Sequence, residues 1–559
     1  MLEQFGLATR EWFKAAFAAP TLAQAGAWRS IGAGRNALVV APTGSGKTLA
    51  AFLWSLDRLA HEPPPKDPKH RCRVLYISPL KALAVDVERN LRAPLTGIRQ
   101  ASGRLGLPPP EITVGMRTGD TPADERRAFA RTPPDILITT PESLFLLLTS
   151  AARESLRGVE TVIIDEVHAV AATKRGAHLA LSLERLDALL GRPAQRVGLS
   201  ATVRPIDETA RFLVGAGDVE IVQPRSSKVI EVTVQVPVED MTRLDETPEV
   251  DPDKPGSGRH TPSIWPAVEE RVLELIQAHK STIVFTNSRR GAERLGARIN
   301  ELAAEHEAEA ALLALAGSQA AAPGGSTDPG SPALSGFRPP PDSRAPAALM
   351  AQSPIATGAP AVVARAHHGS VSREERKQIE EALKSGRLPA VVATSSLELG
   401  IDMGAVDLVV QIEAPPSVSA GLQRIGRAGH QVGAVSRGVV FPKHRGDLVS
   451  CAVVAERMAE GAIEELRYPR NPLDVLAQQI VAMVALEVWQ LDELAALVRR
   501  SAPYAELPDS ALHAVLDMLS GRYPSTAFAE LRPRLVWDRT TDELTGRPGA
   551  QRLAVTSGG

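Results

Sequence analysis

Cysteine is almost absent from this sequence of 559 residues, which contains only Cys72 and Cys451, far apart in the chain. Two thiols cannot form a disulfide framework, a four-thiolate zinc site or a thiolate-held iron–sulfur cluster, so we expect both to be isolated and buried. No apolar stretch approaches the roughly 20 residues needed to span a bilayer, and Met1–Gln4 does not begin like a secretory signal. These absences predict a cytoplasmic protein without a membrane segment, zinc or iron–sulfur cluster.

An excess of positive charge is missing as well. The 63 Lys and Arg residues are balanced by 65 Asp and Glu residues, and the net charge is −2. Nucleic-acid-binding domains usually show a basic surface that the composition reveals. If this protein holds DNA or RNA, it does so through a local groove, which only sequence motifs can indicate.

Short apolar runs alternate with longer helical stretches through most of the chain. Each run ends in a polar or glycine-bearing turn, which is typical of α/β domains whose ligand sites lie at the carboxyl ends of parallel strands. We expect two such domains in tandem, residues 1–223 and 224–455, because single cores rarely exceed roughly 250–300 residues. The expected strands are Ala37–Val40, Val74–Ile77, Ile136–Ile138, Val162–Ile164 and Val197–Leu199, followed by Thr282–Phe285, Ala361–Ala364, Ala390–Ala393, Leu408–Ile412 and Gly438–Phe441.

Two segments rich in small and polar residues interrupt this pattern. Asp245–Pro262 and residues 305–360 are expected to be flexible, without a catalytic role. The Ala-rich start of the second segment, Glu305–Leu315, is expected to extend the helix before it.

The last part of the chain, residues 456–559, has a different pattern. Three helices followed by a β-hairpin predict a winged helix. Carboxylates outnumber basic residues here, so a helical buttress is as consistent with the sequence as direct DNA contact. The chain stops directly after the expected hairpin, which suggests a fragment of a longer protein. The expected helices are Leu473–Val484, Leu491–Val498 and Ala511–Leu519, and the expected strands are Arg534–Arg539 and Arg552–Val555.

A phosphate-binding loop is predicted at Ala41–Thr48, between an apolar strand and a helical stretch. Its sequence APTGSGKT has the spacing of this loop, with Ala in place of the first glycine. Backbone N–H groups of such loops surround phosphates at a helix N-terminus. We expect Lys47 to meet the β and γ phosphates of ATP and Thr48 to ligate Mg²⁺. The other loop residues predicted to bind ATP are Thr43, Gly44, Ser45 and Gly46.

A second set of residues at strand ends complements this loop. Asp165 follows an expected strand and is placed to hold the metal, and Glu166 is placed to activate the attacking water. The hydroxyls of Ser200 and Thr202, at another strand end, are expected to hydrogen-bond His168 and so couple the site to the neighbouring loop.

The second α/β domain carries a basic, glycine-punctuated cluster at Gln423–His430 but no phosphate loop of its own. We interpret Gln423, Arg424 and Arg427 as groups that act in trans on the γ-phosphate of ATP held by the first domain. Hydrolysis would then depend on closure of the two domains, which couples chemistry to movement.

Together these motifs resemble the superfamily 2 helicases, and among them the Lhr (large helicase-related) family. The resemblance includes Trp12-Phe13, Phe17, Pro20-Thr21, Gln24 and Trp28 as an adenine-sensing region, and Ser78–Leu83, Arg117–Thr121, Thr139–Leu144, Phe285–Arg289, His367–Ser370 and Ala393–Asp402 as further motifs. It implies RecA-like domains, contact of Gln24 with the adenine base, and ATP contacts by Gly400, Asp402 and His430. It implies strand contacts by Pro79, Lys81, Arg117, Gly119, Thr140, Pro141, Asn287, Arg289, His368, Thr394 and Ser395.

The function that the resemblance implies is ATP-dependent translocation 3′ to 5′ along single-stranded DNA. The paired strand to be displaced is DNA, or RNA in an RNA:DNA hybrid, and DNA repair is the expected setting. Strand-binding loops of this kind hold phosphates without reading sequence, so they need few net positive charges. His430 occupies a position where many superfamily 2 relatives have a third arginine, and the family continues well beyond residue 559.

Two alternatives remain open from the sequence. An RNA helicase would use the same phosphate-gripping motifs, which do not exclude a 2′-OH; His168 and the expected winged helix favour DNA. An ATP-gated clamp that separates no strands would be indicated by loss of Lys47, Glu166 or the arginines, and all of them are present.

Overall fold

The computed structural model describes residues 2–42, 44–224, 229–241, 263–320, 363–398, 404–429, 434–522 and 532–556. The chain divides into two compact units, Met1–Ser226 with Glu464–Gly559, and Ser227–Ile463. The predicted excursion at Asp245–Pro262 and most of the predicted insertion, from residue 321 on, lie outside the described residues.

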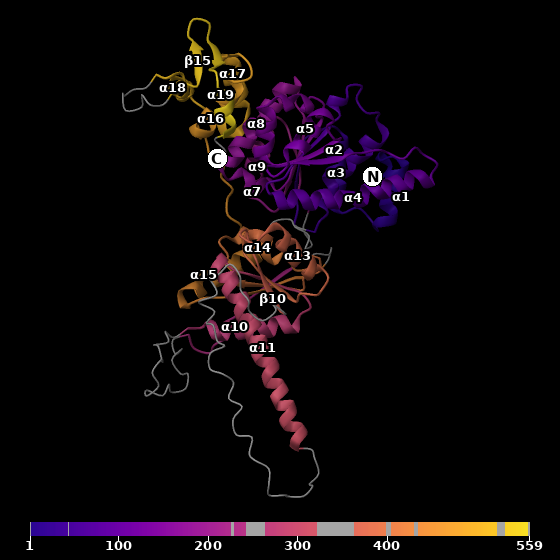
Figure 1. The fold of residues 1–559 in the computed structure, drawn as a ribbon, viewed down its shortest axis with the longest axis vertical. Coiled ribbons are helices and arrows are strands. Elements are labelled where there is room, and N and C mark those ends of the chain that lie inside the picture. Colours follow the sequence, from indigo (N-terminus) through magenta and orange to yellow (C-terminus); the bar gives the residue numbers. More distant parts are fainter. Residues whose placement is uncertain are drawn as a thin grey trace. The chain divides into compact units, whose positions relative to one another are not determined.

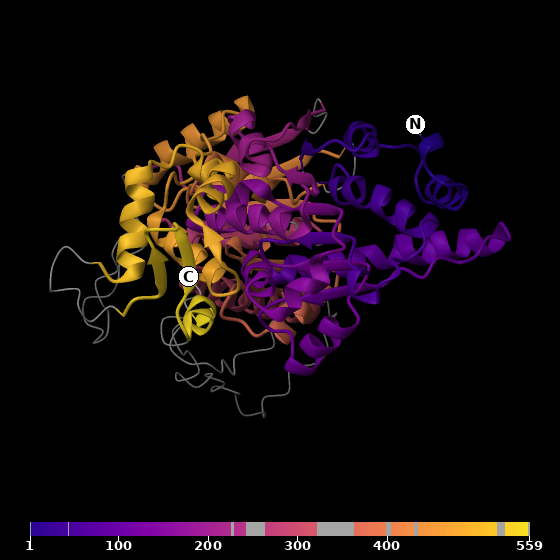
Figure 2. The same ribbon diagram turned by 90° about the horizontal axis from the view of Figure 1, so that it is seen from above.

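The first unit is built on sheet A, a seven-stranded sheet in the order β3-β4-β2-β5-β6-β1-β7. All of its strand pairs are parallel, as the sequence pattern predicts. The sheet is seen in indigo to magenta in Figure 1 and from above in Figure 2. Its strands are β1 (Ala37–Val40), β2 (Val74–Ile77), β3 (Val114–Arg117), β4 (Ile136–Thr139), β5 (Thr161–Ile164), β6 (Gln195–Ser200) and β7 (Glu220–Val222).

Helices cover both faces of sheet A because side chains alternate between the faces along each buried strand. In β1, Ala37 and Val39 pack with α1 to α4, whereas Leu38 and Val40 pack with α6 to α9. The helices are α1 (Leu7–Ala16), α2 (Leu22–Gly32), α3 (Lys47–His61), α4 (Lys81–Arg104), α5 (Ala123–Arg131), α6 (Pro141–Leu148), α7 (Val167–Ala171), α8 (Lys174–Leu190) and α9 (Ile206–Val214), with short 3₁₀ turns η1 (Leu2–Gln4), η2 (Pro68–His70) and η3 (Ala151–Leu156).

The second unit contains sheet B, a six-stranded sheet in the order β10-β11-β9-β12-β13-β8 with parallel pairs. Helices again cover both faces. The elements are β8 (Ile230–Val234), α10 (Trp265–Ala278), β9 (Thr282–Phe285), α11 (Arg289–Ala320), β10 (Ala364–His367), α13 (Arg373–Lys384), β11 (Ala390–Ala393), η4 (Ser395–Leu397), β12 (Leu408–Ile412), α14 (Val418–Ile425), β13 (Ser436–Phe441) and α15 (Arg445–Glu460).

Differences from the sequence-based prediction concentrate at the sheet edges. The observed edge strand β10 covers Ala364–His367 and shares only Ala364 with the strand expected at Ala361–Ala364, of which residues 361–362 lie outside the described residues. It includes the polar Arg365 and His367, so an apolar run is a poor guide to its bounds. The strands β3, β7 and β8 were not expected from the sequence; they are short and partly exposed. Helix α11 does continue through Glu305–Leu315, as predicted.

Residues 464–556 form the predicted winged helix. Its helices are α16 (Leu473–Val484), α17 (Leu491–Arg500), α18 (Asp509–Ser520) and α19 (Ala550–Thr556), with a short turn η5 (Ala502–Tyr504), and its sheet has the order β14-β16-β15 from β14 (Trp489–Gln490), β15 (Leu535–Asp538) and β16 (Glu543–Gly546). The prediction of a strand at Arg552–Val555 is wrong. That segment is helical and packs Ala554 into the core, while the more polar β16 pairs antiparallel with β15.

The winged helix shares its hydrophobic core with the α/β domain of the first unit. Phe145 of α6 and Ala177 and Leu181 of α8 belong to the same buried cluster as Leu476 and Ile480 of α16. This shared core explains why residues 464–559 group with the first unit and are not a separate compact body. The boundaries at 223/224 and 455/456 stay predictions.

Both cysteine thiols are buried, as predicted. Within the described residues, no helix is long and apolar enough to cross a membrane. Within the same residues, no group of three or more His, Cys, Asp or Glu side chains could hold a metal ion.

Candidate functional site

The phosphate loop connects β1 to α3 at the carboxyl end of sheet A. Gly44 and Gly46 have φ angles of 85° and 78°, a left-handed conformation that glycine adopts without steric cost. A Cβ on Gly46 would lie 2.5 Å from Gln24 Nε2, so a larger residue there would have to displace the Gln24 amide. The Ser45 hydroxyl is buried and has no hydrogen-bond partner among the described residues, which fits a loop shaped for a polar ligand. Thr43 lies outside the described residues.

Two side chains, Lys47 in the loop and Gln24 beside it, form hydrogen bonds with other residues of the protein. Lys47, at the start of α3, donates a hydrogen bond to the Ala41 carbonyl. Gln24 donates from Nε2 to the Gly46 carbonyl at 3.4 Å, and its Oε1 accepts from Thr21 N–H at 3.0 Å. Gln24 therefore ties α2 to the phosphate loop, and its contact with adenine stays a prediction.

Asp165 follows β5 and lies at the carboxyl edge of the sheet beside the end of β2. Its Oδ1 accepts from Glu166 N–H at 2.9 Å, and its Oδ2 accepts from the Tyr76 hydroxyl. Burial raises the pKa of Asp165 to about 7, and the nearby charge of Glu166 adds to this rise. The sequence did not point to Tyr76, which has the pattern of a core residue and stacks on Phe52.

Glu166 is one of four non-glycine residues with positive φ in the described chain, at φ 44° and ψ 49°. Such a conformation costs of order 1–3 kcal/mol and is found preferentially at functional sites. It starts α7 and leaves Glu166 Oε2 3.5 Å from His168 Nε2.

His168 connects Glu166 to β6. Its Nδ1 lies 3.0 Å from Ser200 Oγ and accepts from Ala201 N–H at 3.3 Å, which leaves the proton of a neutral ring on Nε2, toward Glu166. Burial lowers the pKa of His168 and favours this neutral ring. The predicted hydrogen bond from Ser200 is confirmed. Thr202 is exposed, and no described hydrogen bond joins it to His168.

Arg424, on α14 of the second unit, is only 3% exposed and is surrounded by acceptors of its own domain. Its Nε and Nη2 donate to Glu398 Oε2 at 3.1 and 3.0 Å, and its Nη1 donates to Asn287 Oδ1 and Gln411 Oε1, both at 3.0 Å. The guanidinium also lies 5.4 Å from the Phe285 ring centroid. Through these contacts Arg424 ties together the end of η4, the turn after β9 and strand β12, which the sequence did not indicate.

The other predicted residues of the Gln423–His430 cluster are described only in part. Arg427 is also buried and donates from Nη2 to the Glu398 carbonyl at 2.9 Å. Gln423 Nε2 donates to Ser419 Oγ at 3.4 Å. Gly400, Asp402 and His430, which were predicted to contact ATP, lie outside the described residues.

The strand-binding residues predicted in the first unit follow three adjacent strands, β2, β4 and β3. Lys81 Nζ pairs with Asp120 Oδ1 at 2.6 Å, next to Gly119, and Pro79 lies in the turn before α4. Arg117 lies 5.4 Å from the Phe129 ring centroid, and burial lowers its pKa. Thr140, ahead of Pro141, is buried and caps α6 by accepting from Ser143 N–H at 3.4 Å.

The strand-binding residues predicted in the second unit follow β9, β10 and β11, which are also neighbours. Asn287 Nδ2 donates to the Ala414 carbonyl at 2.8 Å in addition to accepting from Arg424. Arg289 Nη1 donates to Ser370 Oγ at 3.0 Å, and His368 Nε2 pairs with Glu293 at 2.5 Å. Thr394 is half-buried and Ser395 is exposed at the start of η4.

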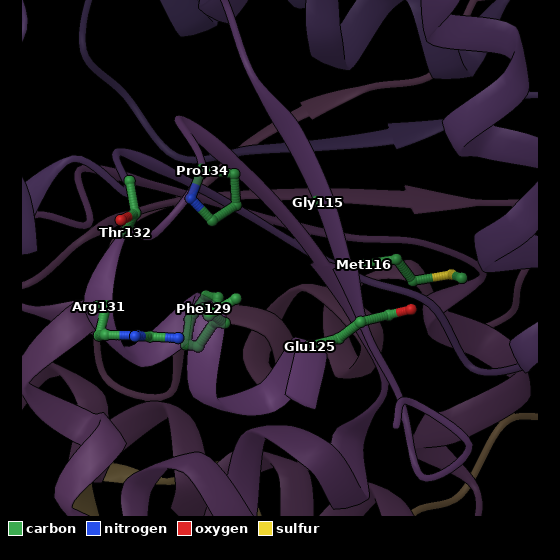
Figure 3. A pocket seen from close by; sticks show the side chains of 8 residues that line it. Gly115, Met116, Glu125, Phe129, Arg131, Thr132 and Pro134 are labelled. Carbon is green, nitrogen blue, oxygen red and sulfur yellow. The ribbon is translucent and has the colours of Figure 1, made fainter. Parts of the chain in front are cut away.

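A pocket of about 510 Å³ lies beside the edge strand β3, with Phe129, Pro134 and Met116 among its lining residues (Figure 3). None of its lining residues belongs to the predicted ATP or strand-binding sets. Phe129 is linked to the predicted strand-binding residues only through its contact with Arg117.

Comparison with known proteins gives three matches to family models along the chain. Residues 21–209 match the DEAD/DEAH box helicase family, and residues 353–431 match the helicase conserved C-terminal domain. Residues 456–559 match the winged helix domain of large helicase-related protein.

The chain is 62% identical to the Lhr helicase/probable uracil glycosylase of Mycolicibacterium smegmatis, over 100% of this chain and 34% of that protein. It is 53% identical to the Lhr helicase/uracil glycosylase of Escherichia coli, over 99% of this chain and 35% of that protein. The structure of Mycobacterium smegmatis helicase Lhr bound to ssDNA and AMP-PNP is similar with a TM-score of 0.82 and 59% identity, over 100% of this chain and 62% of that one. The chain thus spans about a third of the length of these two curated relatives.

Proposed function

The chain belongs to the Lhr family of superfamily 2 helicases, and on that premise we propose that it is an ATP-dependent helicase that moves 3′ to 5′ along single-stranded DNA. Its proposed substrates are DNA:DNA and RNA:DNA duplexes, and its proposed setting is DNA repair. Support comes from the mycobacterial relative, whose structure holds ssDNA and AMP-PNP.

The observation that carries the proposal is the chain of contacts that links the carboxylates to the neighbouring strands. Tyr76 donates to Asp165, and Glu166 lies next to His168, which is bonded to Ser200. The backbone carbonyl of Ser200 in turn accepts from Ala41 N–H, at 3.1 Å, at the start of the phosphate loop. We propose that a shift of the loop reaches Glu166 along this path, through the backbone bond to Ser200, the Ser200–His168 bond and the 3.5 Å contact between His168 and Glu166.

Each residue of this site has a proposed task. Lys47 leaves the Ala41 carbonyl to meet the β and γ phosphates, and backbone N–H groups from Gly44 to Thr48 hold them. Glu166 orients the attacking water and accepts its proton, and the neutral His168 beside it keeps the carboxylate in place.

Thr48 and Asp165 are the residues that would hold Mg²⁺, which neutralises phosphate charge when bound. Mg²⁺ usually takes only one or two protein carboxylates together with phosphate oxygens and waters. The absence of a cluster of three or more candidate ligands among the described residues is therefore compatible with it.

Arg427 is proposed as the arginine that stabilises negative charge on the γ-phosphate during transfer. Arg424 is proposed to position it, because Glu398 accepts from Arg424 through its carboxylate and from Arg427 through its carbonyl. The roles of His430, Gly400, Asp402 and Gln423 at the nucleotide are proposed on the family resemblance alone.

The winged helix is proposed as a buttress for the first domain. Helix α18 corresponds to the helix that enters the major groove in helix-turn-helix proteins. It contains Asp509, His513 and Asp517 but no Lys or Arg, and a groove-reading helix needs positive charge.

The catalytic assignment is tested with Glu166→Gln. We expect turnover of ATP in the presence of ssDNA to fall by at least about 10²-fold, the size of a general-base contribution, while binding of ATP and ssDNA is retained. Glu274→Gln, which removes an exposed carboxylate paired with Arg271 on α10, serves as the control. Hydrolysis at the normal rate in Glu166→Gln would refute the role of this residue.

Polarity and substrate are tested by strand displacement on duplexes with a 3′ or a 5′ tail, each with DNA or RNA as the displaced strand. We expect displacement only from a 3′ DNA tail, with either displaced strand. ATPase stimulation by RNA alone would indicate an RNA helicase. Hydrolysis without displacement from any duplex would indicate an ATP-gated clamp.

A further inference from the structure

A second pocket, of about 160 Å³, lies inside the first unit where the winged helix meets α8. Three arginines line it from the first domain: Arg153 on η3, Arg157 directly after η3, and Arg185 on α8. Met483 and Trp489 line it from the winged helix. None of these residues belongs to the proposed ATP or strand-binding sites.

Arg185 is a buried cation with neutral partners. It is 8% exposed. Its Nη1 donates to Gln479 Oε1 at 2.8 Å, and its Nη2 donates to the Leu148 carbonyl at 3.4 Å and to Thr149 Oγ1 at 3.3 Å. Among the described residues, no carboxylate oxygen lies within 4.0 Å of it. Burial lowers its pKa to about 9, and a buried charge without a counter-ion is costly.

The other two arginines are paired, but only with exposed carboxylates. Arg153 lies 2.6 Å from Glu487 and 3.6 Å from Glu154, and Arg157 lies 2.5 Å from Glu154. Three guanidinium groups thus share two carboxylates, which leaves one positive charge in excess beside the pocket. That excess is greatest at Arg185, the deepest of the three.

The apolar walls of the pocket strengthen the attraction between this excess positive charge and an anion. Leu148, Met483 and Trp489 are apolar neighbours of the guanidinium groups, and charges in a low-dielectric site interact more strongly than in water. Guanidinium forks match the oxygen geometry of phosphate and sulfate, and they bind such anions through paired hydrogen bonds. The volume of about 160 Å³ admits one such group but not a whole nucleotide.

We propose that this pocket binds an oxyanion of the phosphate type and thereby stabilises the attachment of the winged helix to the first domain. The ligand is inorganic phosphate or a backbone phosphate of a nucleic acid. Both present the same tetrahedral oxygens, so the chemistry of recognition is the same. Because residues of both parts line the pocket, an anion bound there stabilises the shared fold by mass action.

The test is a calorimetric titration of thermal unfolding with sodium phosphate, against sodium chloride at equal ionic strength. The phosphate loop also binds this anion, so the titration is made in the Lys47→Ala variant. We expect a saturable rise in the Tm of the first unit of about 2–4 °C that chloride does not produce. No phosphate-specific rise would overturn the proposal.

The site is located with Arg157→Gln in the same background, since Arg157 is 39% exposed and its loss leaves the core intact. Arg211→Gln is the matched control, because Arg211 forms the same i,i+3 pair with Glu208 on the surface, outside the pocket. We expect at least a fivefold weaker phosphate response in Arg157→Gln and no change in Arg211→Gln. An undiminished response in Arg157→Gln would overturn the proposal.

The source of the phosphate is decided by the affinity for an ssDNA oligonucleotide, measured with Lys47 intact and without nucleotide. If a backbone phosphate occupies the pocket, Arg157→Gln weakens DNA binding and Arg211→Gln does not. If both variants bind DNA like the unmodified chain while the thermal response to phosphate depends on Arg157, the ligand is free phosphate.

Discussion

Lys81, which we propose as a strand contact, already forms an ion pair with Asp120 of the neighbouring loop. His368 has a similar partner in Glu293. A nucleic-acid phosphate that approaches Lys81 has to displace a carboxylate, and that carboxylate then repels it. Such pairing explains how a strand-binding groove can exist in a chain of net charge −2, and it weakens the grip on each phosphate, which helps a motor to release its strand.

Asp120→Asn should therefore tighten ssDNA binding by about two- to fivefold, since exposed ion pairs are worth roughly 0–1 kcal/mol. Fluorescence anisotropy with a labelled oligonucleotide at fixed salt measures this change. Glu88→Gln, which removes the half-buried partner of the exposed Arg92 on α4, should leave the affinity unchanged. Weaker binding by Asp120→Asn would mean that Asp120 shapes the loop and does not compete with the strand.

Arg424 and Arg427 should respond differently to substitution. Arg424→Met removes the partner of Glu398 and Gln411 in a buried network, so we expect the free energy of unfolding of the second unit to fall by about 3–5 kcal/mol. Arg427→Ala should lower ATP turnover by about 10³-fold or more while ATP binding is kept. Thermal unfolding and steady-state ATPase assays measure the two effects. Loss of turnover without loss of stability in Arg424→Met would restore Arg424 as a direct γ-phosphate contact.

Among the helices and strands, α8 packs against two different parts of the molecule. Its face toward sheet A builds the core of the first unit, and its opposite face holds the winged helix through Ala177, Leu181 and Arg185. The Gln479 amide of α16 donates to the Ser182 hydroxyl and to the His178 carbonyl, both at 3.1 Å. Because α8 is buried on both faces, we expect a substitution in the winged helix that shifts α8 to change the packing against sheet A as well.

His178, on this helix, makes the stability of the contact depend on pH. Burial lowers its pKa to about 4, with the charge of Arg185 adding to the effect. Between pH 6.5 and 4 the unfolded chain binds a proton that the folded protein does not, so the free energy of unfolding falls as the pH falls through this range. We expect a loss of about 2–3 kcal/mol from this residue.

Chemical denaturation at pH 7 and pH 4.5 measures this loss. His178→Gln should show a smaller difference between the two pH values than the unmodified chain. His70→Gln, which changes an exposed histidine, should show the same difference as the unmodified chain. An unchanged pH dependence in His178→Gln would exclude this residue as the cause.

At the scale of the whole molecule, the chain divides into two compact units, and the winged helix groups with the first α/β domain in one of them. A buried ion network adds to the shared core, because Glu184 and Asp187 of α8 pair with Arg196 of β6 and also with Arg500 of α17. The winged helix should consequently unfold together with the first domain.

Differential scanning calorimetry should then show two transitions and not three. Arg500→Ala should lower the Tm of one transition by about 2–4 °C and leave the other in place, since it removes a half-exposed partner of two buried carboxylates. Arg35→Ala, which removes an exposed pair with Glu220 in the same unit, should change neither. A third, independent transition would show that the winged helix is a separate body.

Several features of the fold could be predicted from the sequence because they depend on local patterns. The buried strands β1, β2, β9, β11 and β12 lie at the predicted residues, since each is an apolar run closed by a turn. The edge strands and β16 could not be predicted in this way. Their side chains are partly polar, and only pairing with a neighbouring strand holds them extended.

The candidate site likewise has features that the sequence predicts and features that only the structure shows. The sequence alone placed Asp165 and Ser200 at strand ends and Lys47 at the start of a helix, since each adjoins a recognisable apolar run. Only the tertiary structure decided that Tyr76 bonds Asp165, that Arg424 is enclosed by Glu398 and Gln411, and that Arg185 bonds Gln479. These contacts join residues 13 to 294 positions apart, and no local pattern encodes them because they arise only when separate elements pack together.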